Sequence, residues 1–327
     1  MTKTSMVSMF AVLLAGTGCK KDESSSSATG TGSAAPTGST PTAGSGAAAE
    51  TPAAAPSAGP IELAEGLSTP ESVLYDATSD VYLVSNINGV PTEADDNGYI
   101  SKVSPDGKLL EAKWIDGAKP DVQLDAPKGS AIVDGVLWVA DITNVRRFDA
   151  ASGAPKGDIA IEGAAFLNDV TPDGKGGVFV TDTGVNGKFE PTGADAVYHI
   201  TADGKVTPLV KSKDLGGPNG IAAGADGSVW VVTFGSGELY QVTAKGEKLP
   251  SEKLPKGQLD GIVALDGGDL LVSSWEGKVV FRGKPGGPWT EVVTNVEAPA
   301  DIGWDGKRAR VLVPLFTANK VQAHPIK

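Results

Sequence analysis

The sequence predicts an all-β fold, a six-bladed β-propeller with four antiparallel strands per blade. A short motif recurs six times at intervals of roughly 40 to 57 residues. A run of β-branched or aromatic residues follows each copy, and apolar residues at helical spacing are nearly absent from the same part of the chain. Repeats of this length with several short strands are typical of propeller blades, because a single unit cannot bury its own apolar face.

The N-terminal residues 1–18 are predicted to be a signal peptide. Lys3 precedes an apolar run that is long enough for a secretory signal and too short to span a bilayer. Cys19, the single cysteine, follows small residues as at the cleavage site of a bacterial lipoprotein, although Gly16 stands where that pattern usually has leucine. We expect Cys19 to be the lipidated first mature residue and the protein to be exported to the cell envelope, periplasmic or at the surface. An ordinary signal peptide with an incidental Cys19 is the alternative.

Residues 19–59 consist largely of Ser, Ala, Gly, Thr and Pro. Such a segment cannot bury enough apolar surface to offset its ordering entropy, so it is predicted to be a disordered linker. A flexible chain of this length reaches roughly 35 Å. It would tether the propeller, predicted for residues 60–327, to a lipid anchor at Cys19.

Composition excludes several classes of function. The chain has 28 basic and 40 acidic residues and a formal charge of −12, which argues against a nucleic-acid partner or an anionic membrane surface. One cysteine excludes a disulfide framework and a cysteine metal cluster. Two histidines, His199 and His324, leave little room for imidazole metal sites or Ser-His-Asp chemistry.

Each copy of the motif differs at its third position. The copies are Thr69-Pro70-Glu71-Ser72, Ala126-Pro127-Lys128-Gly129, Phe166-Leu167-Asn168-Asp169, Gly217-Pro218-Asn219-Gly220, Gln258-Leu259-Asp260-Gly261 and Ala298-Pro299-Ala300-Asp301. In a radial arrangement these six third positions meet on the axis. We interpret the motif as a loop that precedes the inner strand of each blade.

The predicted inner strands are runs with little charge that are expected to be buried on both faces, at residues 81–86, 136–141, 178–183, 229–234, 270–275 and 310–315. Turn sequences at residues 104–107, 202–204 and 244–246 predict the outer hairpins. The last repeat has room for only three strands, so Ile61–Leu63 is predicted to complete the sixth blade and close the ring.

Two repeats carry insertions after these strands, at residues 88–97 and 184–195, and we expect them to form a partial lid on one face. The first insertion contains an acidic cluster that matches no calcium loop, and we interpret it as a solvated turn. Asp141 and Asp182, at the ends of their strands, are expected to cap turns.

Four of the six third positions carry oxygen ligands: Glu71, Asn168, Asn219 and Asp260. Two carboxylates and two amide carbonyls suit a hard cation, Ca²⁺ first and Mg²⁺ or Mn²⁺ as alternatives, and do not suit zinc. Each residue alone is a common turn former or surface residue. Their shared register in four repeats predicts a metal site on the axis.

The same residues resemble a known family. Glu71-Ser72 with Tyr75, Asn168-Asp169, Pro218-Asn219-Gly220 and Leu259-Asp260-Gly261 are similar to the metal-binding motifs of the senescence-marker-protein/gluconolactonase family, which includes regucalcin. The resemblance covers roughly residues 60–327. It implies a six-bladed propeller with one divalent cation on its axis and lactone hydrolysis. It implies Glu71, Asn219 and Asp260 as direct ligands, Asn168 near metal and substrate, and Asp260 as general base.

Two positions depart from that family. Lys128 occupies the axial position of the second blade, where it could stabilise an oxyanion as a catalytic residue or pair with Glu71 or Asp260 and replace the metal. Phe166 stands where animal members carry a substrate-contacting arginine, so sugar-acid lactones are not assumed as substrates.

The sequence therefore leaves three hypotheses. The first is a cell-envelope, metal-dependent hydrolase of a lactone or related ester. The second is the same propeller acting as a binding module for a ligand or protein without turnover, and the third is a structural envelope lipoprotein. The fold by itself does not decide among them.

Overall fold

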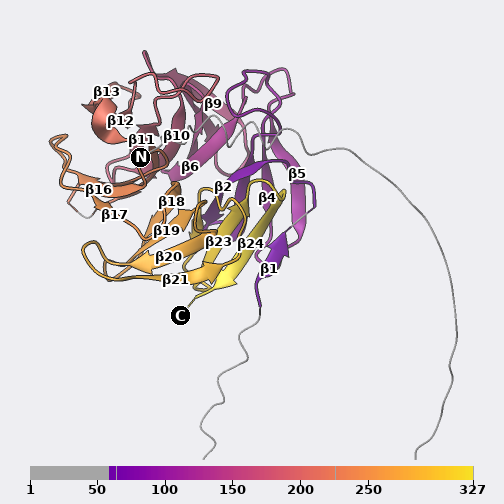
Figure 1. Ribbon diagram of the computed structural model, residues 1–327. Helices are drawn as coiled ribbons and strands as arrows, with labels where there is room; N and C mark the ends of the chain where they lie inside the picture. Colours follow the sequence, from indigo (N-terminus) through magenta and orange to yellow (C-terminus); the bar gives the residue numbers. More distant parts are fainter. Residues whose placement is uncertain (1–58, 64, 225, 327) are drawn as a thin grey trace, which may run out of the picture.

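The computed structural model describes residues 59–63, 65–224 and 226–326 and shows a six-bladed propeller. Six four-stranded antiparallel sheets surround a central axis (Figure 1). This confirms the predicted fold class. The predicted signal peptide, Cys19 and nearly all of the predicted linker lie outside the described residues, and these assignments stay predictions.

Blades 1 to 3 follow one another along the chain. Their strands are β2 (Pro70–Asp76), β3 (Val81–Asn86), β4 (Tyr99–Val103) and β5 (Leu109–Asp116) in blade 1; β6 (Pro127–Val133), β7 (Val136–Asp141), β8 (Asn144–Asp149) and β9 (Pro155–Ala160) in blade 2; and β10 (Leu167–Pro172), β11 (Val178–Asp182), β12 (Ala196–Ile200) and β13 (Val206–Lys211) in blade 3.

Blades 4 to 6 repeat the pattern. Their strands are β14 (Pro218–Ala223), β15 (Val229–Thr233), β16 (Glu238–Val242) and β17 (Glu252–Lys253) in blade 4; β18 (Leu259–Ala264), β19 (Leu270–Ser274), β20 (Val279–Gly283) and β21 (Trp289–Thr294) in blade 5; and β22 (Gly303–Asp305), β23 (Arg310–Leu315), β24 (Lys320–Pro325) and β1 (Ile61–Leu63) in blade 6.

The N-terminal strand closes the ring, as predicted. β1 pairs antiparallel with β24 as the outermost strand of blade 6, so the first and last strands of the propeller lie in one sheet (Figure 1). Leu63 is 2% exposed and packs into a core shared by blades 1 and 6. Blade 1 is further joined to blade 6 by the Asp301 amide, which donates to the Glu71 carbonyl (2.9 Å). Closure pairs β24 with β1, so β24 is not left as a free edge of blade 6.

The motif lies in the innermost strand of blades 1 to 5, and not in a loop before it. The runs that the sequence assigned to inner strands are the second strands, β3, β7, β11, β15, β19 and β23. In the first five blades the register between first and second strand shifts at the motif. Such a bulge re-aims side chains, so that neighbouring residues both reach the axis. The Gly, Pro and Asn residues of the motif are typical of turns, and the same residue types occur at β-bulges. The composition therefore suggested a turn where the structure has a bulge.

The second strands are nearly completely buried, as their composition indicated. They pack between the innermost and third strands, and the apolar cores lie between adjacent blades. Within the described residues helix is limited to the 3₁₀ turn Lys213–Leu215, and no helix there has the length and apolar character needed to cross a bilayer.

Candidate functional site

One end of the propeller axis gathers five predicted side chains into a single cavity, here called the axial site. Its charged and amide residues are Glu71, Lys128, Asn168, Asn219 and Asp260, one from each of blades 1 to 5, and Thr183 is the further polar residue in the lining. All five are buried, with exposed fractions between 1% and 6%. The sixth third position, Ala300, is fully buried and packs in an apolar cluster beside the site. The enclosed volume is about 40 Å³, which is space on the scale of a water molecule or an ion.

Four buried oxygens of the axial site have no hydrogen-bond partner among the described residues. They are Glu71 Oε2, Asn168 Oδ1, Asn219 Oδ1 and Asp260 Oδ1. A buried polar atom without a partner loses its hydration without compensation, at a cost of about 1–3 kcal/mol. These are the four residues that the motif comparison selected, and each directs one orphaned oxygen to the same cavity.

The orientation of the Asn168 amide is fixed by a short relay to the next blade. Its Nδ2 donates to Thr183 Oγ1 (3.0 Å), and Thr183 Oγ1 donates to the Pro218 carbonyl (2.6 Å). Because the hydroxyl proton is used on Pro218, Thr183 can only accept from Asn168. The amide nitrogen therefore faces Thr183, and the carbonyl oxygen faces the axis.

Asp141 and Asp182 hold the chain just before two of the motifs. Asp141 accepts from the backbone amides of Asp125 (3.1 Å) and Ala126 (2.7 Å). Asp182 accepts from the amides of Ala165, Phe166 and Gly184, each at 2.9 Å. Both are thus the turn-capping residues that the sequence predicted, and they position the axial residues without contacting the cavity.

Lys128 enters the cavity without bonding to either acid. Its Nζ donates to the Ala126 carbonyl (2.9 Å) and lies 4.3 Å from the centroid of the Phe166 ring. The described part of the chain contains no ion pair between Lys128 and Glu71 or Asp260. The sequence allowed an arrangement in which Lys128 pairs with Glu71 or Asp260 and replaces the metal. The structure does not show that arrangement.

Burial sets the electrostatics of the axial site. Desolvation raises the pKa of Glu71 well above its usual value, and the nearby Asp260 and Asp301 charges raise it further. Desolvation and the Asp301 charge likewise raise the pKa of Asp260. A hydrogen bond from the Trp275 indole lowers this pKa and offsets part of the increase. Desolvation lowers the pKa of Lys128. Two desolvated acids with unsatisfied oxygens form a site that a cation would stabilise.

Aromatic side chains cover the axial site and form what we call the aromatic roof: Phe166, Phe189, Phe234, Trp275 and Phe316. Phe166 meets Phe189 edge to face (6.0 Å between centroids), and Trp275 lies between Phe234 (5.4 Å) and Phe316 (5.3 Å). Ile87, Pro91 and Val185 fill the remaining wall. The surroundings of the polar oxygens are therefore almost entirely apolar.

The two insertions meet above this roof. Residues 184–195 form a hairpin in which Val185 bridges Pro191, and its turn places Phe189 with a left-handed backbone (φ 58°) over the axis. Pro91 of the first insertion lines the same cavity, and Thr92 approaches the Gly187 carbonyl (3.5 Å). The expected lid is therefore present. The acidic cluster of the first insertion is an exposed turn.

Sequence reasoning missed two further carboxylates on the axis. Asp169 and Asp301 follow the third position of motifs 3 and 6 and lie buried one step further along the axis. The signal was present in the fourth letter of the motif, which is Gly in three copies, Ser in one and Asp in these two. It was missed because a regular strand would turn consecutive side chains to opposite faces.

Solved structures with the same fold include enzymes and a calcium-binding protein. A gluconolactonase from Xanthomonas campestris aligns at a TM-score of 0.62 with 18% identity over 82% of this chain and 89% of its own. Regucalcin from Agrobacterium tumefaciens, a calcium-binding protein, aligns at 0.57 with 20% identity over 83% and 96%. Virginiamycin B lyase from Staphylococcus aureus aligns at 0.56 with 17% identity over 82% and 99%.

These alignments establish the fold. The structural neighbours include the gluconolactonase and regucalcin proteins that the motifs resemble. No protein-family model and no curated protein sequence matches the chain. Its chemistry must therefore be argued from the axial site itself.

Proposed function

We propose that this chain is a divalent-metal-dependent hydrolase that acts on a lactone or related ester. The observation that carries the proposal is the set of four orphaned oxygens from four separate blades, which converge on one cavity. Two carboxylates and two amide carbonyls form a donor set for a hard cation, with Ca²⁺ first and Mg²⁺ or Mn²⁺ as alternatives. Glu71, Asn168, Asn219 and Asp260 would hold it.

The roles of the side chains follow from their positions. A divalent cation held by these four residues would supply Lewis acidity toward an ester carbonyl. Asp260 is the candidate general base, because a carboxylate beside the cation can orient and deprotonate the attacking water. Lys128 uses one of its three donors on Ala126 and can direct another to the oxyanion. Asn168 keeps its carbonyl on the axis through Thr183.

The aromatic roof selects an apolar substrate. A sugar-acid lactone would bring hydroxyl groups against Phe166, Phe189 and Trp275, where burial would leave them without partners. An ester with an alkyl or aryl body would gain from burial against the same rings. The cavity is too small for such a body as it stands, so the hairpin of residues 184–195 must lift to admit it.

A lyase activity finds less support. One lyase neighbour is a catalytically inactive variant in which a histidine is replaced by alanine. In this chain His199 bonds to Asp173 (2.8 Å) and His324 lies next to Gln322 (2.9 Å), and neither lines the axial cavity. Proton transfer at this site rests on carboxylate and lysine groups, which favours hydrolysis.

Metal binding is expected to stabilise the protein. A ligand that binds only the folded state at about 100 times its Kd adds about 2.7 kcal/mol, which raises Tm by about 5 °C in a domain of this size. Differential scanning fluorimetry of the chelated protein titrated with Ca²⁺, Mg²⁺ and Mn²⁺ measures this shift. Glu71→Gln should reduce it by more than half, whereas Glu162→Gln, at an exposed position, should leave it unchanged. The absence of a shift with every ion would end the hydrolase proposal.

Substrate selection is expected to depend on the aromatic roof. Phe189→Asn removes a ring while introducing a residue type that tolerates the left-handed backbone. We expect kcat/KM for a phenyl- or alkyl-substituted lactone to fall about tenfold, since a buried aromatic contact is worth about 1.5–3 kcal/mol. Glucono-lactone turnover should not fall. Lys188→Ala, exposed in the same hairpin, is the control. Equal losses on both substrates would refute selection by Phe189.

A binding module remains the alternative outcome. A metal-dependent thermal shift without acid release from any lactone or aryl ester would favour a propeller that holds a ligand without turnover. Acid release that follows the metal titration would favour the hydrolase.

A further inference from the structure

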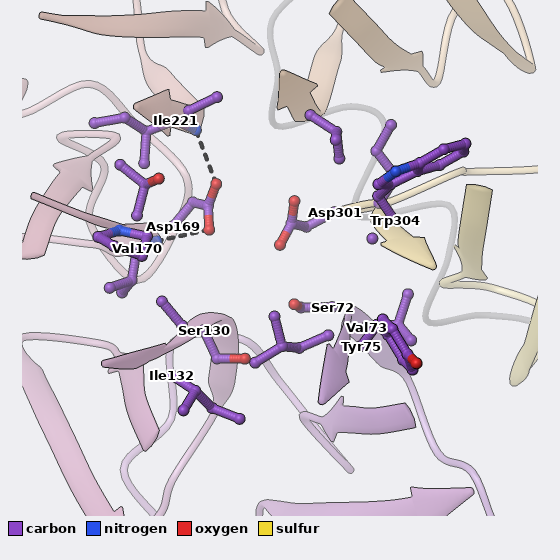
Figure 2. Close-up of a pocket in the computed structure, with 18 of the residues that line it drawn as sticks. Ser72, Val73, Tyr75, Ser130, Ile132, Asp169, Val170, Ile221, Asp301 and Trp304 are labelled. Atoms are coloured by element: carbon purple, nitrogen blue, oxygen red, sulfur yellow. Dashed lines mark hydrogen bonds between the residues drawn. The ribbon is translucent and has the colours of Figure 1, made fainter. Parts of the chain in front are cut away.

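A second cavity opens further along the innermost strands, beyond the axial site. We call it the lower cavity. Its volume is about 530 Å³, within the range of small-molecule sites, and all six blades contribute to its lining. Figure 2 shows its inner end, where Asp169 and Asp301 point toward each other across the axis, with Ser72 and Ser130 beside them.

The two carboxylates come from opposite sides of the ring. Asp169 lies in β10 of blade 3, and Asp301 immediately precedes Ile302 and β22 in blade 6. Their exposed fractions are 5% and 6%. A regular ring of six places blades 3 and 6 across from each other, so the same motif position delivers both acids to one point on the axis.

Glycines in the preceding blades make room for both carboxylates. A Cβ built on Gly129 would lie 2.1 Å from Asp169 Oδ1, and one built on Gly261 would lie 2.7 Å from Asp301 Oδ1. Any side chain at these positions would collide with the acid of the next blade. The sequence therefore keeps space for two carboxyl groups at the inner end of this cavity.

These carboxylates retain acceptor capacity that the protein does not use. Asp169 accepts from the backbone amides of Val170 (2.6 Å) and Ile221 (2.8 Å), and a carboxylate offers about four acceptor sites. The Ser72 hydroxyl is the donor beside Asp301. Neither acid takes part in an ion pair within the described part of the chain. A positive partner would stabilise the charged form of two buried carboxyl groups that face each other.

The walls below the pair are mostly apolar, with Asp76 and Thr171 among the polar residues of the lining. Five blades contribute buried β-branched side chains to the lining: Val73, Val170, Ile221, Ile262 and Ile302. Tyr75 and Trp304 are partly exposed and add aromatic faces to the same cavity (Figure 2). Aliphatic walls suit a hydrocarbon body, and aromatic faces attract an organic cation.

We propose that the lower cavity binds a small organic amine, with its ammonium group between Asp169 and Asp301 and its apolar body along the aliphatic walls. A protonated amine supplies three donors to the unused acceptor sites and one positive charge to the pair. A divalent metal fits less well, because two backbone amides already occupy Asp169 and the side chains beside the pair, Ser72 and Ser130, offer only neutral hydroxyl oxygens. The proposal is independent of the hydrolase proposal.

Isothermal titration of the full-length protein with n-hexylamine, n-hexanol and n-hexanoate at pH 7 tests the inference, since the three probes share one apolar body. We expect one amine per chain and affinity at least tenfold weaker for the alcohol and the acid. Asp301→Asn, which keeps the shape and removes the charge, should weaken amine binding at least tenfold. Asp134→Asn, an exposed position with the same charge change, should not alter it. Equal binding of all three probes, or an unchanged affinity in Asp301→Asn, would overturn the proposal.

A second readout covers the case in which Asp301→Asn does not fold. Amine binding should change the intrinsic fluorescence of the wild type, and most of that change should vanish in Trp304→Phe. Saturating Ca²⁺ distinguishes the two sites. Amine binding that persists at saturating Ca²⁺ supports the lower cavity, whereas complete displacement of the amine by Ca²⁺ would place the amine in the axial site and refute the proposal.

Discussion

Asp260→Asn is expected to abolish lactone and ester hydrolysis, with a loss in kcat/KM of about 10³-fold or more. A positioned general base contributes about 10²–10⁴-fold, and this residue also supplies one of the two carboxylates of the proposed metal site. Asparagine keeps the shape of the side chain and one carbonyl oxygen. It removes both the basicity and the charge. Steady-state hydrolysis of an alkyl-substituted lactone, with and without the stabilising cation, measures the effect.

Stability separates a chemical effect of this substitution from a folding defect. Burial and the Asp301 charge raise the pKa of Asp260, so the folded metal-free protein holds this proton to higher pH than the unfolded chain does. That contribution to stability is complete below the unfolded pKa of about 4 and is lost as pH rises through the folded pKa. At pH 8 the metal-free Asp260→Asn variant should therefore melt no lower than the wild type.

The control for this prediction is Asp266→Asn, an exposed position in the same blade. It should retain full activity and metal response. An Asp260→Asn enzyme with near wild-type kcat/KM would contradict the assigned role, even if the metal still bound. Loss of activity together with a much lower melting temperature in the absence of metal would indicate a structural role instead.

Arg146→Met is expected to lower the free energy of unfolding by about 3–5 kcal/mol, because it removes the cation from a buried cluster of acids. The Arg146 guanidinium bonds to Asp141 (2.7 Å), Asp125 (2.8 Å) and Asp158 (2.9 Å). The side chains of Arg146, Asp125 and Asp141 are 6%, 10% and 0% exposed. Methionine has a similar apolar length but leaves these acids without a counter-charge.

The same substitution should disturb the axial site. Asp141 holds the amides of Asp125 and Ala126, and the Ala126 carbonyl accepts from Lys128. Loss of Arg146 therefore loosens the segment that places Lys128 in the cavity. We expect activity to fall along with stability, and urea unfolding followed by fluorescence gives the free energy.

Arg147→Met is the matched control, one residue further along β8. Arg147 contacts the Trp138 ring (5.4 Å) and the Gly157 carbonyl (3.3 Å) at the surface. Its loss should cost less than about 1 kcal/mol, as is usual for exposed charged residues. Similar losses for both variants would show that the buried cluster is not a major source of stability.

Much of the fold could be predicted because the sequence contains six copies of one repeat. The six motif copies gave the number of blades, and the short sixth repeat predicted that Ile61–Leu63 closes the ring, which β1 and β24 confirm. The uncharged runs identified the second strands, because a strand buried on both faces must be apolar throughout. Their order within the blade was wrong, since the bulge at the motif resembles a loop in composition.

The sequence by itself determined the ring of blades and the third-position residues that lie on its axis, because both follow from periodicity. Only the tertiary structure decided what those residues touch. It placed Lys128 on the Ala126 carbonyl and Phe166, closed an aromatic roof with Phe189 from an insertion, and brought Asp169 to face Asp301. A repeat specifies the register of each blade, whereas contacts across the axis depend on bulges and insertions that bring side chains from distant blades into one space.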